Sequence, residues 1–145
     1  MRSMEAQKTM YGTKGSLWID GELIAEVTGV SAKIELEKTE VKMAGHMSKG
    51  YKVTGFSGKG SFTLNKVSSY FIKKFAPVIA EGKQVLFTLV SAIDDPDSIG
   101  AERVALYNCS VDSVDLINWK VGELGEESYD FTFESFELLD VALED

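Results

Sequence analysis

Apolar and polar side chains alternate with a period of two from Val30 onward, and this pattern constrains the fold more than any other part of the chain. The apolar positions are Val30, Ala32, Ile34 and Leu36, and the polar positions between them are Ser31, Lys33, Glu35 and Glu37. Successive side chains of a strand point to opposite faces of a sheet. The segment is therefore predicted to be an antiparallel strand that buries one face and exposes the other.

Further segments carry strand signals between turn residues. Asp20-Gly21 separates two short apolar runs and predicts a type I′ hairpin, because both central residues of that turn need positive φ. Residues 85–93 are apolar at both sets of alternating positions, which predicts a strand covered on both sides. Other strands are expected over residues 51–64, 103–111 and 129–138.

Two places predict irregular strands. Glycines interrupt the strand pattern of residues 51–64, and such glycines usually mark bulges or close approach of another backbone. These glycines are Gly55, Gly58 and Gly60. The step from Phe133 to Phe136 breaks the period of two, and one bulged residue near Glu134 or Ser135 would restore it.

One helix is predicted between Ser69 and Gly82. Ser68 or Ser69 can cap its start, and the glycine ends it. The apolar stripe at helical spacing consists of Ile72, Phe75, Ala76 and Ile79. Pro77 lies inside the helix and is expected to kink it without dividing it. With about seven strands, the sequence predicts a mainly β fold, an antiparallel β-sandwich or barrel closed by one α-helix.

The whole chain, residues 1–145, is predicted to form a single domain with an irregular arm at residues 1–14. Residues 38–50 lose the alternation and contain several lysines. A loop of this length usually does more than connect two strands, and we interpret it as an extended assembly loop. The residues expected to contact another subunit are Lys38, Lys42, His46, Met47, Lys49, Lys52 and Lys59.

Charge is distributed unevenly along the chain. The formal net charge is −8, which argues against wrapping nucleic acid because phosphate binding needs a basic surface. Residues 1–83 hold 13 Lys and Arg against 8 Asp and Glu, whereas residues 84–145 hold 2 against 15. Two interpretations stay open. Both sets are solvated faces of one domain, or surfaces of opposite sign meet between neighbouring copies, as head-to-tail assembly requires.

The sequence contains no catalytic, cofactor-binding or metal-binding constellation. His46 is the only histidine, so there is no multi-histidine metal site and no Ser-His-Asp arrangement with a choice of base. Cys109 is the only cysteine, which excludes an internal disulfide and favours folding in a reducing compartment. It is expected on a buried strand face, where it behaves as a small apolar side chain.

Two loop-like runs also fail as functional motifs. Residues 55–61 lack the spacing of a phosphate-binding loop, and the segment that starts at Asp95 lacks two ligands of a calcium loop. Neither a secretion signal nor an apolar stretch long enough to span a bilayer is found. The sequence therefore predicts a protein that is not an enzyme, binds no cofactor and does not enter a membrane.

Three phrases of the sequence together resemble the phage tail tube protein family. They are TMYGTKGSLWIDG at residues 9–21, GFSGKGSFTL at residues 55–64 and DPDSIGAER at residues 95–103. The form that they resemble is the tube protein of PBSX-like defective prophages and of diffocin-like contractile bacteriocins of clostridia. The resemblance extends in order from about residue 4 to about residue 140.

The resemblance implies a structural subunit without catalytic activity. It implies hexameric rings that stack into a tube inside a contractile sheath, with a fold similar to the tube of type VI secretion machines. Implied partners are other copies of the chain and the sheath, tape-measure and baseplate proteins, with DNA only as passing cargo. Implied locations are the bacterial cytoplasm during assembly and then a virion or tail-like particle. The alternative is a small β-barrel carrier that binds an apolar ligand.

Overall fold

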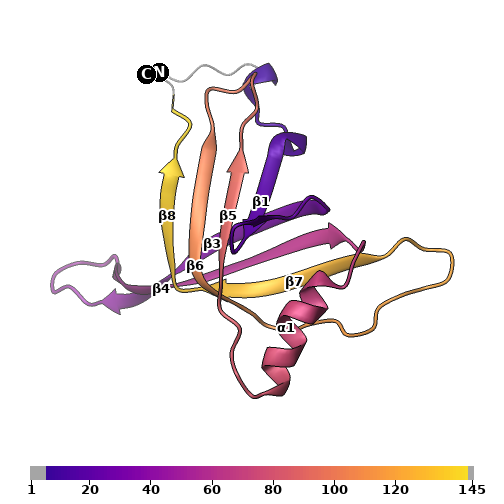
Figure 1. The fold of residues 1–145 in the computed structure, drawn as a ribbon. Helices are drawn as coiled ribbons and strands as arrows, with labels where there is room; N and C mark the ends of the chain where they lie inside the picture. Colours follow the sequence, from indigo (N-terminus) through magenta and orange to yellow (C-terminus); the bar gives the residue numbers. More distant parts are fainter. Residues whose placement is uncertain (1–5, 144–145) are drawn as a thin grey trace.

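Two antiparallel sheets meet at a shared strand and enclose an aromatic core (Figure 1). The computed structural model describes residues 6–143. The first sheet contains β1 (Gly15–Ile19), β2 (Glu22–Leu23), β5 (Phe87–Ile93), β6 (Glu102–Val111) and β8 (Ser135–Asp140). The second contains β3 (Val27–Val41), β4 (Gly50–Asn65), β7 (Glu126–Phe133) and the end of β6. Within the described residues, eight strands and one α-helix confirm the predicted mainly β, antiparallel fold.

The N-terminal part of the chain packs against the β5–β6 connection. Residues 1–5 of the expected arm lie outside the described residues, and the rest forms the short 3-10 helices η1 (Ala6–Lys8) and η2 (Gly12–Lys14). The Tyr11 backbone N–H donates to Asp95 Oδ2 at 3.1 Å. Asp95 Oδ1 also accepts a hydrogen bond from the backbone N–H of Asp97. This bond closes the turn at the start of the connection between β5 and β6.

The turn between β1 and β2 has the predicted geometry. Asp20 and Gly21 have φ values of 51° and 83°, as a type I′ turn requires. The Asp20 carboxylate accepts from the Thr88 backbone N–H at 2.9 Å and pairs with Lys74 at 2.7 Å. This one side chain therefore joins the turn to β5 and to the helix.

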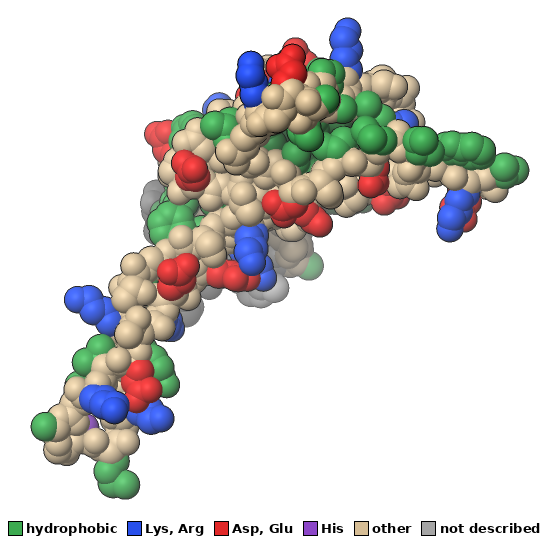
Figure 2. All heavy atoms as spheres, turned by 90° about the horizontal axis from the view of Figure 1, so that it is seen from below, with side chains coloured by type: hydrophobic (Ala, Val, Ile, Leu, Met, Phe, Trp, Pro, Cys, Tyr) green, Lys and Arg blue, Asp and Glu red, His purple; other side chains and the backbone are tan. Residues whose placement is uncertain are grey.

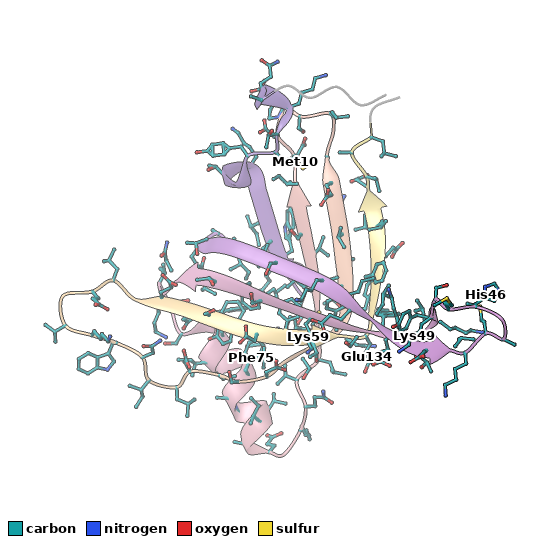
Figure 3. All side chains as sticks on the ribbon, turned by 180° about the vertical axis from the view of Figure 1, so that it is seen from behind. Met10, His46, Lys49, Lys59, Phe75 and Glu134 are labelled. Carbon is teal, nitrogen blue, oxygen red and sulfur yellow. The ribbon has the colours of Figure 1, made fainter. Side chains whose placement is uncertain are left out.

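β3 and β4 form a long hairpin that projects from the rest of the molecule (Figures 1 and 3). The strands continue to Val41 and resume at Gly50, so only residues 42–49 of the predicted loop 38–50 connect them. The prediction that the apolar face of β3 is buried is wrong. Val30, Ile34 and Leu36 are exposed, because their face looks onto an open groove beside β6 and no element covers it.

Glycines in β4 make room for aromatic rings from β7. Gly58 pairs with Phe133 and Gly60 with Phe131. A Cβ atom on Gly58 would lie 2.4 Å from the Phe133 ring, and one on Gly60 would lie 2.5 Å from the Phe131 ring. Next to Gly55, the register shifts by one residue, which is a bulge. The predicted bulge is confirmed, and so is close approach of a backbone at Gly60, where the Ser31 carbonyl oxygen lies 2.7 Å from the Cβ position; at Gly58 the close neighbour is a side-chain ring instead.

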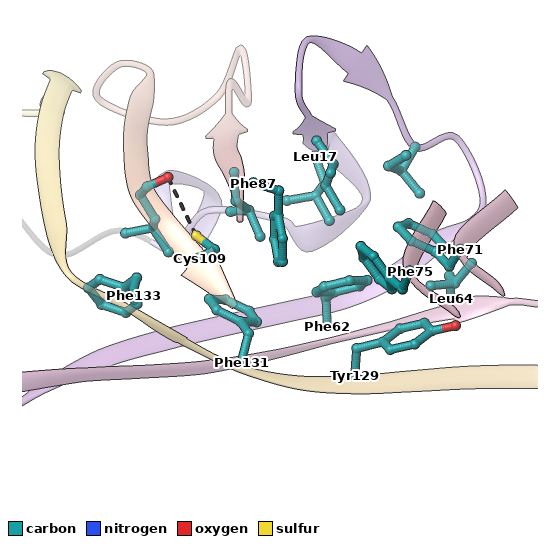
Figure 4. Packing of buried hydrophobic residues seen from close by; sticks show 14 residues of the cluster. Leu17, Phe62, Leu64, Phe71, Phe75, Phe87, Cys109, Tyr129, Phe131 and Phe133 are labelled. Carbon is teal, nitrogen blue, oxygen red and sulfur yellow. Dashed lines mark hydrogen bonds between the residues drawn. The ribbon is translucent and has the colours of Figure 1, made fainter. Parts of the chain in front are cut away.

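The core lies between the two sheets and the helix α1 (Tyr70–Ala80), and aromatic side chains form much of it (Figure 4). Phe71 and Phe75, four residues apart, are the buried residues of the helix. Their ring centroids lie 5.3 Å and 5.8 Å from that of Tyr129. Such tilted and edge-on pairs stabilise a core beyond the area that they bury.

The predicted helix is present, but its buried stripe differs from the prediction. It begins after Ser69 without a side-chain capping bond, continues through Pro77 as one element and ends before Gly82, whose φ is 78°. Phe75 is buried as expected, whereas Ile79 is exposed, because the contact face is centred on Phe71 and Phe75. β5 also differs from the prediction of a strand covered on both sides, because it is fully buried on one face only.

The predicted bulge near Glu134 is instead a corner at which the chain changes sheet. β7 pairs with β4 up to Phe133, and β8 pairs with β6 from Ser135. The Glu134 backbone N–H donates to Tyr107 O at 3.2 Å, and Asn108 Nδ2 donates to its carboxylate at 3.1 Å. Because the chain turns away from the core here, the apolar residues of β8 are exposed.

Phe75→Ala should lower the free energy of unfolding by about 3–5 kcal/mol, since the side chain is fully buried and its loss leaves a cavity among aromatic rings. Ile79→Ala on the same helix is the control and should cost little, because Ile79 is exposed. Urea denaturation followed by circular dichroism measures both. Equal effects of the two substitutions would contradict this packing.

Gly60→Ala should destabilise the protein by about 1–3 kcal/mol, because the new methyl group meets the Phe131 ring at 2.5 Å and the Ser31 carbonyl oxygen at 2.7 Å. Gly29→Ala in β3 is the matched control, since nothing lies within 4 Å of its Cβ position. Thermal unfolding of both variants gives the comparison. An unchanged melting temperature for Gly60→Ala would show that the rings do not hold this register.

Candidate assembly surfaces

The outer face of the second sheet is polar over β3, β4 and β7. Hydroxyl groups face each other across the strands, with Ser31 Oγ 3.4 Å from Ser61 Oγ and Thr63 Oγ1 3.4 Å from Ser128 Oγ. The face also carries charged side chains, Lys33, Glu35, Lys59 and Asp130. We call these residues, with Thr132, the polar face. It follows from the register set by the glycines, because the aromatic residues of β7 all point to the other side.

Lysines on the polar face are partly neutralised. Lys33 and Lys59 lie 3.3 Å and 3.9 Å from the two carboxylate oxygens of Glu35. Exposed pairs of this kind contribute little to stability, about 0.2–1 kcal/mol each. Lys59 was expected to contact another subunit. It lies within the sheet, away from the end of the hairpin (Figure 3).

The structure brings the other residues expected at a subunit contact together at the end of the hairpin. We call residues 38–53 the hairpin tip. Lys38 lies in β3, Lys52 lies in β4, and the rest lie in the connection at residues 42–49: Lys42, His46, Met47 and Lys49. All of these side chains are exposed. Lys49 is 3.9 Å from Glu40, within the tip itself.

A second projecting element was not anticipated from the sequence. Residues 112–125, between β6 and β7, form a loop at the opposite end of the second sheet from the hairpin tip (Figure 1). Val114 packs against the core, whereas five other large apolar side chains of this loop are between 65% and 98% exposed: Leu116, Ile117, Trp119, Val121 and Leu124. We call this segment the apolar loop. Figure 2 shows apolar atoms gathered along this projection.

The base of the apolar loop is held firmly. The Lys66 backbone N–H donates to Gly125 O at 2.9 Å, and Lys66 Nζ donates to Glu127 Oε1 at 2.6 Å. Glu127 is buried and the Lys66 side chain is 34% exposed, so this ion pair is partly shielded from solvent. In the sequence, Ile117, Trp119 and Val121 alternate with polar residues as in a short strand, so the local pattern does not indicate an exposed loop.

Three of the described strands end their sheets: the two-residue β2, which bonds only to β1, and the longer β3 and β8. β3 is the end of its sheet and bonds only to β4, and β8 bonds only to β6. Phe136 of β8 is exposed and packs edge-on against Phe56 of β4, with ring centroids 6.1 Å apart. Unpaired edges of this kind accept strands or side chains of another chain.

The residues considered for chemistry lie apart from one another. His46 is exposed in the hairpin tip, and Cys109 is buried in the core with its Sγ 3.5 Å from Leu106 O (Figure 4). Burial raises the pKa of the Cys109 thiol to about 12, so it stays protonated and a poor nucleophile at neutral pH. Within residues 6–143, no group of three His, Cys, Asp or Glu side chains is placed to hold a metal ion. No helix in this range is long and apolar enough to cross a membrane.

Comparisons with known proteins agree with one another. A family model described as "Phage tail tube protein" matches residues 2–140. The phage-like element PBSX protein XkdM of Bacillus subtilis is 37% identical over 138 residues, which cover 94% of each chain.

Two of the solved structures with a similar fold belong to assemblies that contain a tube. A chain from the tube-terminating cap of the anti-feeding prophage has a TM-score of 0.75 at 7% identity, with 97% of both chains covered. A chain from the sheath–tube complex of the extracellular contractile injection system PVC has a TM-score of 0.69 at 8% identity, with 94% of this chain and 95% of that chain covered.

Replacement of residues 42–49 by Asn-Gly should leave the fold intact and abolish self-association. The two-residue turn suits the Val41–Gly50 register, and none of the removed side chains is buried. Sedimentation velocity and thermal unfolding of the variant and the unmodified chain measure the two effects. If the shortened protein associates normally, the hairpin tip has no role in assembly.

Proposed function

This chain belongs to the phage tail tube protein family, and we propose that it forms hexameric rings that stack into a tube inside a contractile sheath. The observation that carries the proposal is a sheet with one polar face and a projection at each end of its strands, together with two unpaired edge strands, β3 in this sheet and β8 in the first sheet. These features have no role in a free monomer. In a ring, the strand edges contact neighbouring copies, and the projections can contact further copies along the axis.

Ring closure supplies partners for the unpaired edges. The edges of β3 and β8 belong to different sheets and differ in sequence, so a contact between them is head-to-tail. A head-to-tail contact closes into a ring when its rotation divides a full turn evenly. The exposed apolar residues of β3 and β8 then become buried between neighbouring copies, which stabilises the ring at about 25 cal/mol per Å² of apolar surface.

The polar face suits the wall of the channel. It presents serine and threonine hydroxyls and carboxylates, and its two lysines are paired with Glu35. The two lysines of this face are balanced in formal charge by Glu35 and Asp130, and a wall without net positive charge does not hold a polyanion, so DNA passes through as cargo without a specific binding site.

Tail assembly defines the other partners. We propose that the sheath, tape-measure and baseplate proteins contact the tube, and that assembly takes place in the bacterial cytoplasm before the tube becomes part of a virion or tail-like particle. The sheath–tube complex among the similar structures supports this choice of partners. The residues proposed for contacts between copies are those of the hairpin tip, whereas Lys59, first expected at such a contact, lies on the polar face and is assigned to the channel wall.

The carrier alternative finds less support. The space between the second sheet and α1 is filled by aromatic rings, including Phe62, Phe71 and Tyr129, whose centroids lie 5.3–5.6 Å apart. The grooves along β3 open to the surface. A carrier for an apolar ligand needs a cavity that encloses most of that ligand.

Electron microscopy of the purified protein at increasing concentration tests the proposed function. We expect sixfold rings and hollow tubes of constant diameter. Tube growth followed by light scattering should slow as salt rises toward 1 M, where the screening length falls to about 3 Å, because surfaces of opposite charge guide the contact. Monomers alone at every concentration would contradict the proposed function. Growth that accelerates with salt would show that charge does not guide assembly.

A further inference from the structure

The hairpin tip and the apolar loop lie at opposite ends of the strands of the second sheet (Figures 1 and 3). β4 leaves the hairpin at Gly50 and ends at Asn65, where it pairs with Glu126 at the foot of the apolar loop. β3 is the unpaired edge of the second sheet, and β8 is an edge of the first sheet, which meets the second at β6. Contacts along the strand direction are therefore made by these two projections, and contacts across it are made by the edges.

The two projections carry opposite charge. The hairpin tip has four lysines and one glutamate, of which Lys49 and Glu40 form a pair within the tip. The apolar loop has Asp112, Asp115 and Glu123 against Lys120, and Glu126 follows it directly. These carboxylates are exposed, and none forms an ion pair with a lysine or arginine among the described residues. Complementary charge favours one orientation of encounter and excludes the contact of like ends.

Both projections also expose apolar side chains that no part of the same chain covers. The hairpin tip presents Met43, Met47 and Tyr51, and the loop presents the five residues defined above. Methionine adapts its shape to an apolar partner, and tryptophan is enriched among the residues that dominate binding energy. Each projection thus has an apolar centre surrounded by charges of one sign, which is the usual anatomy of an interface.

We propose that the apolar loop of one copy receives the hairpin tip of a copy in the adjacent ring. The inference rests on the proposed function, because it assigns the contact that joins rings that have already closed through their edges. The loop's occupant is thus a second copy of this chain, selected by charge. Because a tip at one end meets a loop at the other, the contact repeats without closing and produces a filament of rings.

Disulfide trapping tests the contact directly. Met47→Cys is combined with Leu124→Cys, while the buried native Cys109 stays reduced. After oxidation of assembled tubes with diamide, non-reducing electrophoresis should show linked chains of more than six subunits. Met47→Cys with Ile99→Cys is the control, since Ile99 is exposed on the β5–β6 connection, away from both projections, and should give none. Tubes that form but give no link, or links confined to six subunits, overturn the inference and leave the proposed function standing.

Charge exchange supplies a second, independent test. Lys42→Glu with Lys49→Glu, or Asp115→Lys with Glu123→Lys, should slow tube growth at least about tenfold while rings still form, because like charges then meet at the contact. All four substitutions together should restore growth. Lys73→Glu with Lys83→Glu, exposed residues on and after α1, controls for the change of net charge and should have no such effect. Unchanged growth with either reversed pair, or no restoration in the fourfold variant, overturns the inference. An unmodified chain that makes no rings contradicts the proposed function instead.

Discussion

The aromatic rings of β7 lie over the glycines of β4, and the arrangement of the second sheet depends on this contact. Phe131 and Phe133 occupy the space that a side chain on Gly60 and Gly58 would fill. A shift of one residue in this pairing would turn every ring of β7 outward and bring its polar residues into the core. Because the rings point inward, they meet the aromatic residues of α1, and the opposite face of the same sheet is left entirely to hydroxyl and charged groups.

The apolar side chains that are not buried in the core lie at the edges and projections of the domain. The apolar residues of β3, of β8, of the hairpin tip and of the apolar loop are exposed in the single chain. A lone domain that exposes this much apolar surface is prone to association, and here the exposed groups lie on edges and projections that point in different directions. The geometry is that of a subunit whose surface is completed by other copies, with sideways contacts through strand edges and lengthwise contacts through the projections.

The sequence predicted the strands, the helix and the turns better than it predicted which of their faces are buried. Asp20-Gly21 identified its turn because the backbone conformation depends on those two residues alone. The alternation after Val30 identified a strand, yet period alone says which side chains share a face and not whether anything packs on it. The change of sheet at Glu134 resembled a bulge, since both shift the period by one residue. The apolar loop was missed because the alternation of Ile117, Trp119 and Val121 with polar residues does not say whether these side chains are buried, and a partner chain leaves no local signal in the sequence.

Amide hydrogen exchange of β3 tests the central claim, that the chain is completed by other copies, most directly. In the isolated subunit, β3 amides that do not face β4 are unpaired at the sheet edge and should exchange within the shortest labelling time. In assembled tubes, the account predicts that protection rises along β3 and in the apolar loop, while the core strand β7 changes little. Equal exchange of β3 and of the apolar loop in subunit and tube would contradict it.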